Sequence, residues 1–342
     1  MFTRKSTSSL PARSWKRAGI GLFFNTAKIT GHGEDADPLL QADGEGRVVL
    51  GVFDGLGGSG SVRCGGADGI QSGAYYGARV ARDTAAAALR TLAPFRDATP
   101  AAIAHVIGAQ LHDALRAYHE EWGGVGSSAL RSSLFRRLPT TAAITIAHAR
   151  GDVARTAVLW AGDSRCYALA ADTGLQQLTV DHLRTREDAL ANLTSDAAIS
   201  RCISADGPAV LDSAEIDLPL PTVLIAATDG CFGYLPTPMH FEALLLETMA
   251  AASSRDQWLD LLRTRITAVA GDDASLAIVA MGWQKHGALR KAFRPRLRTL
   301  MTTYIDPLDS VDDPEAIRRT LWAQYADTYE IYLRPQEAPC TT

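Results

Sequence analysis

The chain has 342 residues, of which 46% are hydrophobic and 21% are charged, a balance typical of a soluble globular protein with a large core. Its net charge of −4 provides no overall basic character, so we expect no nucleic-acid partner. The apolar stretch from Ala18 to Phe24 is short and contains glycines, and no other run approaches a membrane span. We therefore expect a cytoplasmic protein that does not bind membranes.

The first half of the chain predicts two strands followed by two helices. A flexible tail is expected at residues 1–19, before the first strand. Apolar runs and helix-forming composition place the strands and helices at residues 22–29, 46–53, 74–92 and 100–122. The glycine-rich segments between these elements, at 55–73 and 123–139, are predicted to be loops.

The second half predicts many strands, then two helices and a last strand. Strands are expected at 140–149, 153–161, 165–170, 175–179, 216–218, 223–227 and 275–281, and helices at 241–251 and 255–269. The polar stretch at 181–210 predicts an irregular segment with a short helix at 197–203. Clustered strands with separate helices indicate an α+β fold, and the lack of strict alternation argues against a Rossmann fold or an α/β barrel.

The composition changes after residue 283, where a basic stretch contains Lys285, Arg290, Lys291, Arg294, Arg296 and Arg298. Asp313-Pro314-Glu315 then predicts the start of a helix that carries Trp322, Tyr325 and Tyr329 on one face. That face either packs on the core or docks a partner or nucleotide. The chain thus divides into a tail at 1–19, a main domain at 20–282 and a C-terminal helical extension at 283–342.

Acidic residues recur at the ends of the apolar runs, at Glu34-Asp35, Asp54, Asp163, Asp229 and Asp272. Each could be a turn residue on its own, because Asp-Gly after a strand usually forms a turn. Their repetition beside glycines is harder to explain by turns alone. Carboxylate oxygens are hard ligands that suit Mg²⁺ and Mn²⁺, so the pattern predicts one metal site. The five cysteines are scattered and lack a C-x-x-C pair, which argues against zinc and disulfides and for a reducing compartment.

The order of these motifs resembles that of the metal-dependent protein serine/threonine phosphatases of type 2C, the PPM family, in its bacterial form. The matching segments are Glu34-Asp35-Ala36, Asp54-Gly55-Leu56-Gly57-Gly58, Thr140-Thr141-Ala142, Gly162-Asp163-Ser164-Arg165, Thr179-Val180-Asp181-His182, Thr228-Asp229-Gly230 and Asp272-Asp273-Ala274-Ser275. They run in family order across residues 20–282. The resemblance implies a four-layer αββα sandwich, in which two antiparallel sheets are flanked by helices.

The resemblance also implies a site with two Mn²⁺ or Mg²⁺ ions and in some members a third. Asp54 would bridge both ions. Asp229 and Asp272 would complete the coordination of the first ion, and Glu34 with the carbonyl of Gly55 would bind the second ion. Asp35 would orient the attacking water, and Asp163 would bind the third ion with Asp229. Catalysis would be direct attack of a metal-bridging water on phosphoserine or phosphothreonine in a phosphoprotein, whose phosphate a serine/threonine kinase partner supplies.

The sequence departs from the family pattern at two positions. Thr30 stands where many members have the arginine that grips the phosphate, and Lys28, His32 or Arg63 are the candidate substitutes. Leu56 stands where some members have histidine, so the acid that protonates the leaving group is unassigned. We expect His182 to make a structural hydrogen bond, and the segment at 59–73 to cover the site.

Two other functions stay open from the sequence. One is a pseudophosphatase, a regulatory module that binds phosphoproteins; the missing arginine favours it and the retained acids oppose it. The other is a metal-dependent hydrolase of small phosphoesters. The physiological substrate, the choice of metal and the oligomeric state cannot be read from these residues.

Overall fold

The computed structural model describes residues 18–43, 45–91, 98–123, 136–183, 190, 198–310 and 314–333. The predicted flexible tail lies almost wholly outside these residues, as does most of the loop predicted at 123–139. The strands are β1 (Ile20–Thr26), β2 (Leu39–Ala42), β3 (Arg47–Val52), β4 (Arg63–Cys64), β5 (Gln71–Ser72), β6 (Ala142–Arg150), β7 (Val153–Ala161), β8 (Arg165–Ala170), β9 (Gly174–Gln177), β10 (Asp212–Pro219), β11 (Thr222–Ala227) and β12 (Ala274–Met281).

The helices are α2 (Gly73–Thr91), α3 (Pro100–Trp122), α4 (Pro238–Ala251), α5 (Arg255–Val269), α6 (His286–Leu300), α7 (Asp306–Asp309) and α8 (Pro314–Tyr329). A 3₁₀ turn at Asp229–Cys231 and a π-helical turn at Met301–Ile305 complete them. Residues 198–203 are not helical, contrary to the short helix predicted at 197–203, because the backbone of Ile203 pairs with that of Thr140 in a β-bridge.

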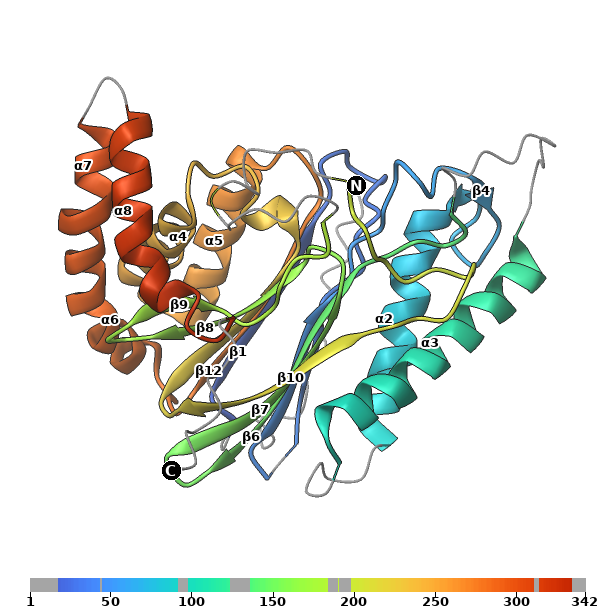
Figure 1. Ribbon diagram of the computed structural model, residues 1–342, viewed down its shortest axis with the longest axis horizontal. Coiled ribbons are helices and arrows are strands. Elements are labelled where there is room, and N and C mark those ends of the chain that lie inside the picture. Colours follow the sequence, from blue (N-terminus) through green and yellow to red (C-terminus); the bar gives the residue numbers. More distant parts are fainter. Residues whose placement is uncertain are drawn as a thin grey trace, which may run out of the picture.

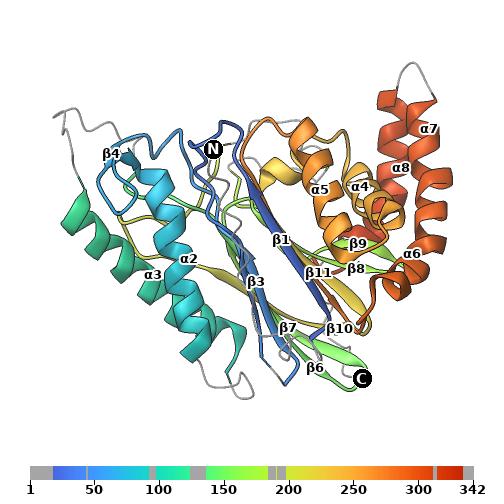
Figure 2. The same ribbon diagram turned by 180° about the vertical axis from the view of Figure 1, so that it is seen from behind.

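Two five-stranded antiparallel sheets face each other at the centre of the molecule. Their strand orders are β1-β12-β11-β8-β9 and β10-β7-β6-β3-β2, and β4 pairs with β5 in a small separate hairpin. Helices α2 and α3 cover the second sheet, while α4, α5, α6 and α8 lie on the side of the first (Figure 1). The view from behind shows β1 of the first sheet and β3 of the second between the two helical layers (Figure 2). The predicted αββα sandwich is confirmed.

Strand alternation explains why the central strands are apolar on both faces. Along β3, Val48, Leu50 and Val52 point into the core between the sheets, whereas Val49 packs with the α2 and α3 side. In β12, Leu276 and Ile278 face the helices, and the intervening residues face the opposite sheet. Each strand is therefore buried from both sides, and a continuous apolar run is the pattern that this position requires.

The C-terminal helices share the core of the sandwich. Trp322, Tyr325 and Tyr329 on α8 are buried in the same cluster as Tyr167 of β8 and Phe241 of α4. Of the two readings of this aromatic face, packing on the core is the one observed. The sequence predicts only a basic stretch where α6 forms, although its buried residues Leu289, Phe293 and Leu300 recur at helical spacing.

Candidate metal centre

The acidic positions lie at the ends of strands and gather at one end of the sandwich. Asp54 follows β3, Asp163 connects β7 to β8, and Asp229 follows β11. Asp272 precedes β12, and the Glu34-Asp35 pair lies between β1 and β2. Strands that are neighbours in an antiparallel sheet alternate in direction, so the residues after one strand meet those before the next.

The pairing register confirms this arrangement in both sheets. In the first sheet Thr26 pairs with Ala274, and Ala227 pairs with Leu276, which brings the end of β1, the end of β11 and the start of β12 together. In the second sheet the end of β3 lies beside the start of β6, which in turn lies beside the end of β7. The register therefore delivers residues far apart in the sequence to one edge.

The Thr140-Thr141 pair holds the backbone around Asp54. The amide of Thr141 and the Oγ1 of Thr140 both donate to the carbonyl of Asp54, at 2.8 and 2.7 Å. The amide of Asp54 donates to Thr141 Oγ1 at 3.3 Å, and this hydroxyl lies 2.7 Å from Ser164 Oγ. A hydrogen-bonded chain thus joins the Asp54 loop to the loop that carries Asp163.

Asp35 is buried, with 2% of its surface exposed, and is held by the start of β12 and the end of β11. Thr228 Oγ1 donates to Asp35 Oδ2 at 3.0 Å and accepts from the amide of Ser275 at 2.9 Å. Asn25 Nδ2 donates to the carbonyl of Asp35 at 3.0 Å. These bonds leave the carboxylate little freedom to turn.

Glu34 lies between the glycine loop after Asp54 and the β4–β5 hairpin. Ser72 Oγ donates to Glu34 Oε1, so a residue of the segment predicted to cover the site does contact it. A Cβ added to Gly57 would lie 1.8 Å from Glu34 Oε2 and 2.8 Å from its Cδ. Gly57 therefore permits a close approach of backbone and carboxylate, and any other residue there would require the Glu34 carboxylate to move.

Arg79 and Asp273 hold the turn before Glu34, and sequence reasoning had assigned neither of them a role. Arg79 Nη1 donates to the carbonyl of Glu34 at 3.1 Å and Nη2 to that of Gly33 at 3.3 Å. Asp273 Oδ2 accepts from the amide of Glu34 at 2.5 Å and Oδ1 from that of Lys28 at 2.8 Å. The Asp-Asp pair before β12 signalled Asp273, whereas an arginine within an alanine-rich helix gave no signal.

Burial and mutual repulsion raise the pKa values of the clustered carboxyls. Burial is the main cause at Asp35, whose pKa rises to about 7, and at Asp163, whose pKa rises to about 8. The pKa of Asp54 rises well above its ordinary value, through burial and then through the charges of Asp35, Asp229 and Asp163. The pKa of Asp229 rises as well, through burial and the charge of Asp272. A cation bound among these carboxyls would offset their repulsion and favour their charged forms.

The donor chemistry fits a hard divalent cation. Asp163 Oδ1 is buried and has no hydrogen-bond partner among the described residues, and the carboxylates around it raise one another's pKa. Asp272 is exposed at the rim, and Gly55 pairs with Thr140 in a β-bridge next to the cluster. Within the described part of the chain, no three His, Cys, Asp or Glu side chains are arranged tightly enough to form a finished coordination group. The residues predicted as metal ligands therefore lie near one another, and their role as ligands stays a prediction.

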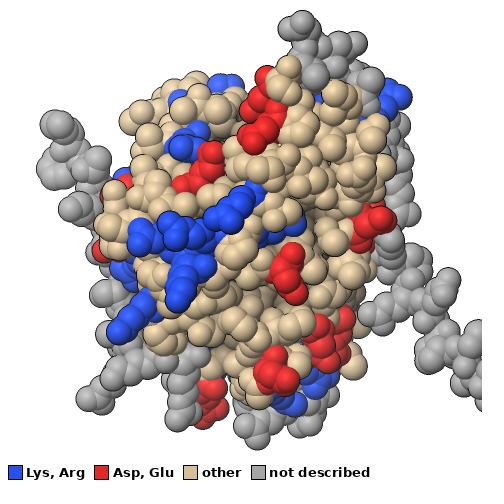
Figure 3. All heavy atoms as spheres, turned by 90° about the vertical axis from the view of Figure 1, so that its left-hand side faces the viewer, with Lys and Arg blue, Asp and Glu red and all other residues tan. Residues whose placement is uncertain are grey.

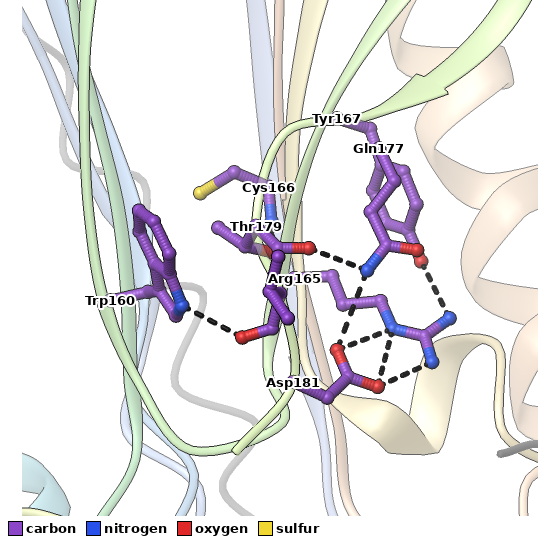
Figure 4. Close-up of polar contacts among 8 residues, drawn as sticks. Trp160, Arg165, Cys166, Tyr167, Gln177, Thr179 and Asp181 are labelled. Atoms are coloured by element: carbon purple, nitrogen blue, oxygen red, sulfur yellow. Dashed lines mark hydrogen bonds and ion pairs between the residues drawn. The ribbon is translucent and has the colours of Figure 1, made fainter. Parts of the chain in front are cut away.

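Arg165, one residue beyond Ser164, pairs with Asp181 beneath the site. Its Nε and Nη2 donate to Asp181 Oδ1 and Oδ2 at 2.9 and 2.6 Å, and both side chains are at most 4% exposed (Figure 4). The guanidinium carbon lies 4.4 Å from the ring centroid of Phe232, in the turn that carries Asp229. This buried pair therefore links the Asp163 loop, the Asp229 turn and the segment after β9.

His182 makes structural hydrogen bonds, as expected. Its Nδ1 accepts from the amide of Gly162 at 3.0 Å, and its Nε2 lies 3.0 Å from Asp212 Oδ2. The acceptor at Nδ1 places the ring proton on Nε2, facing the carboxylate. His182 thus supports the turn that precedes Asp163.

A sandwich of two antiparallel sheets between helical layers, with carboxylates gathered at one edge, is the architecture expected of the metal-dependent protein phosphatases. The family model for protein phosphatase 2C matches residues 34–267, more than half of the chain. The chain therefore belongs to the protein phosphatase 2C family, and its enzyme class is that of the protein phosphatases.

Solved structures share the fold. A bacterial serine phosphatase is 14% identical with a TM-score of 0.56, covering 78% of this chain and 99% of that chain. Serine/threonine phosphatase Stp1 from Staphylococcus aureus is 14% identical with a TM-score of 0.55, covering 77% and 94%. The Mycobacterium tuberculosis serine/threonine phosphatase PstP/Ppp is 15% identical with a TM-score of 0.53, covering 77% and 98%. At these identities the likeness shows the fold alone. No curated protein matches the sequence significantly.

Proposed function

We propose that the chain hydrolyses phosphoserine and phosphothreonine in proteins, using Mn²⁺ or Mg²⁺ held by the acidic cluster. The observation that carries this proposal is the meeting of Asp35, Asp54, Asp163 and Asp229 at one edge, where they raise one another's pKa. The metal ligands would be Glu34, Asp54, Gly55, Asp163, Asp229 and Asp272, for two ions, or for three as in some members of the family. When bound, such ions neutralise phosphate oxygens and activate water.

The residues of the chain then position the reactants. Asp35, held by Thr228, would orient the water that attacks phosphorus in line, with no covalent phosphoenzyme. Arg79 would keep the Glu34 turn against the site through its bonds to backbone carbonyls. A phosphoprotein substrate requires a serine/threonine kinase that places the phosphate, and we propose such a partner.

The cysteines at 64, 166, 202 and 231 are free thiols, which supports a reducing compartment such as the cytoplasm. Among the described helices, none has the length and apolar character needed to cross a bilayer.

We propose that residues 20–282 form the catalytic unit and 283–342 an extension that completes its core. The aromatic face of α8 covers Tyr167 of β8, and Arg296 of α6 pairs with Glu242 of α4 at 2.6 Å. Both contacts join the extension to elements of the catalytic unit. The tail at 1–19 lies mostly outside the described residues.

Phosphate release from a phosphothreonine peptide, measured with Mn²⁺, with Mg²⁺ and with EDTA, tests the proposal. Turnover is expected with metal and not with EDTA, and excess metal should restore it. A folded protein that is inactive with every metal, yet binds the phosphopeptide, would instead be a pseudophosphatase. Thr30 favours that second function, because it replaces the arginine that binds the phosphate in many members of the family. Two other arginines donate instead to backbone carbonyls, Arg63 to that of Ile70 and Arg79 to those of Gly33 and Glu34. Faster turnover of free phosphometabolites than of the peptide would indicate a small-phosphoester hydrolase.

Gly57→Ala is expected to raise the Mn²⁺ concentration for half-maximal turnover by about tenfold, as for other residues that orient metal ligands. The added methyl group would collide with the Glu34 carboxylate and push this ligand aside. Gly58→Ala is the matched control, because a Cβ there has no described neighbour within 4 Å. Equal metal requirements in the two variants would remove Glu34 from the proposed ligand set.

A further inference from the structure

Helices α4 and α6 line a surface cavity of about 460 Å³. Its apolar wall is formed by Leu246, Met249, Phe293 and Leu297. The other lining residues include Arg290, Lys291 and Arg294 of α6, whose side chains are exposed. The cavity therefore combines an apolar interior with a cationic rim, and it is built from elements that contribute no residue to the acidic cluster.

The cations continue along α6 beyond the cavity. Arg290, Arg294 and Arg298 are spaced four residues apart, with Lys291 beside them, so they share one helix face. Residues 286–300 contain no Asp or Glu. Lys and Arg side chains gather in a continuous patch on the side of the molecule where α6 lies (Figure 3). We name the cavity and its cations Arg290, Lys291, Arg294 and Arg298 the α6 face.

The charge of the α6 face is not balanced locally. Lys291, Arg294 and Arg298 form no ion pair with another described residue, whereas Arg296, which points inward, pairs with Glu242. Arg290 donates to the carbonyl of Ala252 at 3.1 Å, and so partly supports the end of α4. Because the whole chain carries a net charge of −4, this concentration of positive charge is a local feature.

We propose that the α6 face docks an acidic segment of a partner protein, with one large apolar side chain of that segment entering the cavity. Successive cations at four-residue spacing lie about 6 Å apart along the helix axis. Carboxylates at i and i+4 of a partner helix have the same spacing. The segment would thus run along α6, with its carboxylates on the cations and its apolar residue between α4 and α6.

The chemistry of the cavity favours a peptide over the other polyanions. A nucleic-acid backbone would satisfy the cations but has no apolar side chain to fill the space between Leu246 and Phe293. Binding to an anionic membrane uses apolar side chains that project outward. The large hydrophobic side chains exposed on the described residues, such as Val106 and Trp122, do not line this cavity.

Fluorescence anisotropy with a labelled peptide of about 16 residues, carrying Glu at every fourth position and one central Phe, tests the proposal. Wild-type protein should bind it, and more weakly as salt rises from about 50 to 300 mM. Lys291→Gln/Arg294→Gln should weaken binding about tenfold, because two charged contacts are lost. Ala250→Trp, at an exposed position of the lining, should block the cavity while keeping every cation.

Arg90→Gln/Arg116→Gln is the matched control, since it removes two exposed charges from α2 and α3. It should bind the peptide as wild type does, and a peptide with Ser in place of Phe should bind more weakly. Equal binding by wild type and Lys291→Gln/Arg294→Gln overturns the proposal. So does capture of phosphatidylserine vesicles or a DNA duplex without binding of the peptide. Turnover of a small phosphoester should be unchanged in all these variants, so failure of docking is distinguishable from failure of the proposed phosphatase function.

Discussion

Replacing Asp54 by Asn is expected to lower phosphopeptide turnover at saturating Mn²⁺ by at least about a thousandfold, the scale seen when a central catalytic group is removed. Asp54 lies at the middle of the acidic cluster, where the charges of Asp35, Asp229 and Asp163 all act on it. An amide presents one neutral oxygen in place of two charged ones, and it cannot bridge two cations as a carboxylate does. Phosphate release over a range of Mn²⁺ concentrations measures the effect.

Asp217→Asn is the control with the same chemical change, because Asp217 is exposed on β10. It should retain wild-type turnover. If Asp54→Asn keeps more than about a tenth of the activity, the bridging role is wrong. The acidic cluster would then serve another purpose, and the chemistry would have to be sought elsewhere on the chain.

Asp54→Asn, which should lower turnover, should raise the stability of the metal-free protein. The fold raises the pKa of Asp54, which means that the folded protein favours the protonated carboxyl. This contribution to stability is fully present below the ordinary pKa of aspartate, and it is lost as the pH rises through the raised pKa of the folded protein. Asparagine stays neutral at every pH. In EDTA, Asp54→Asn should therefore melt at a higher temperature than wild type at pH 8, with little difference at pH 4. A lower melting temperature at pH 8 would contradict the electrostatic account.

The layers of the fold could be predicted because its central strands are buried on both faces. The run from Val48 to Phe53 is apolar at every position, and the acid follows where the strand ends. Asp54 marks the end of that run, because a carboxylate inside the sheet would be costly to bury. The ends of the strands were thus visible as transitions from apolar residues to Asp-Gly, and their antiparallel order brought the acids together.

The supports of the site were less predictable because they depend on contacts between distant elements. Nothing in the sequence distinguishes Asp272, which is exposed, from Asp273, which accepts from the amides of Glu34 and Lys28. Arg79 lies on α2 and contacts the Glu34 turn, and the position of α2 is set by its packing on the sheet. Local propensity contains no information about such tertiary contacts, so the roles of Asp273 and Arg79 become visible only in the folded chain.

Arg165→Met is expected to lower the free energy of unfolding by about 3–5 kcal/mol, the usual cost of breaking a buried ion pair from one side. Asp181 would keep its burial and lose its three hydrogen bonds from Nε and Nη2. Methionine replaces much of the volume of the arginine stem, so the loss reports mainly the unpaired carboxylate. Urea unfolding in EDTA measures the stability without a contribution from bound metal.

The double variant Arg165→Met/Asp181→Leu should regain much of this stability, because both charges are gone and an apolar contact takes their place. Arg155→Met is the control, since Arg155 pairs with Glu215 on the exposed surface and its replacement should change stability little. If the double variant recovers stability but not turnover, the ion pair aligns the Asp163 loop with the Asp229 turn for catalysis. If the double variant is as unstable as the single one, the unpaired carboxylate is not the cause, and the cation over the Phe232 ring is the interaction that holds the two loops together.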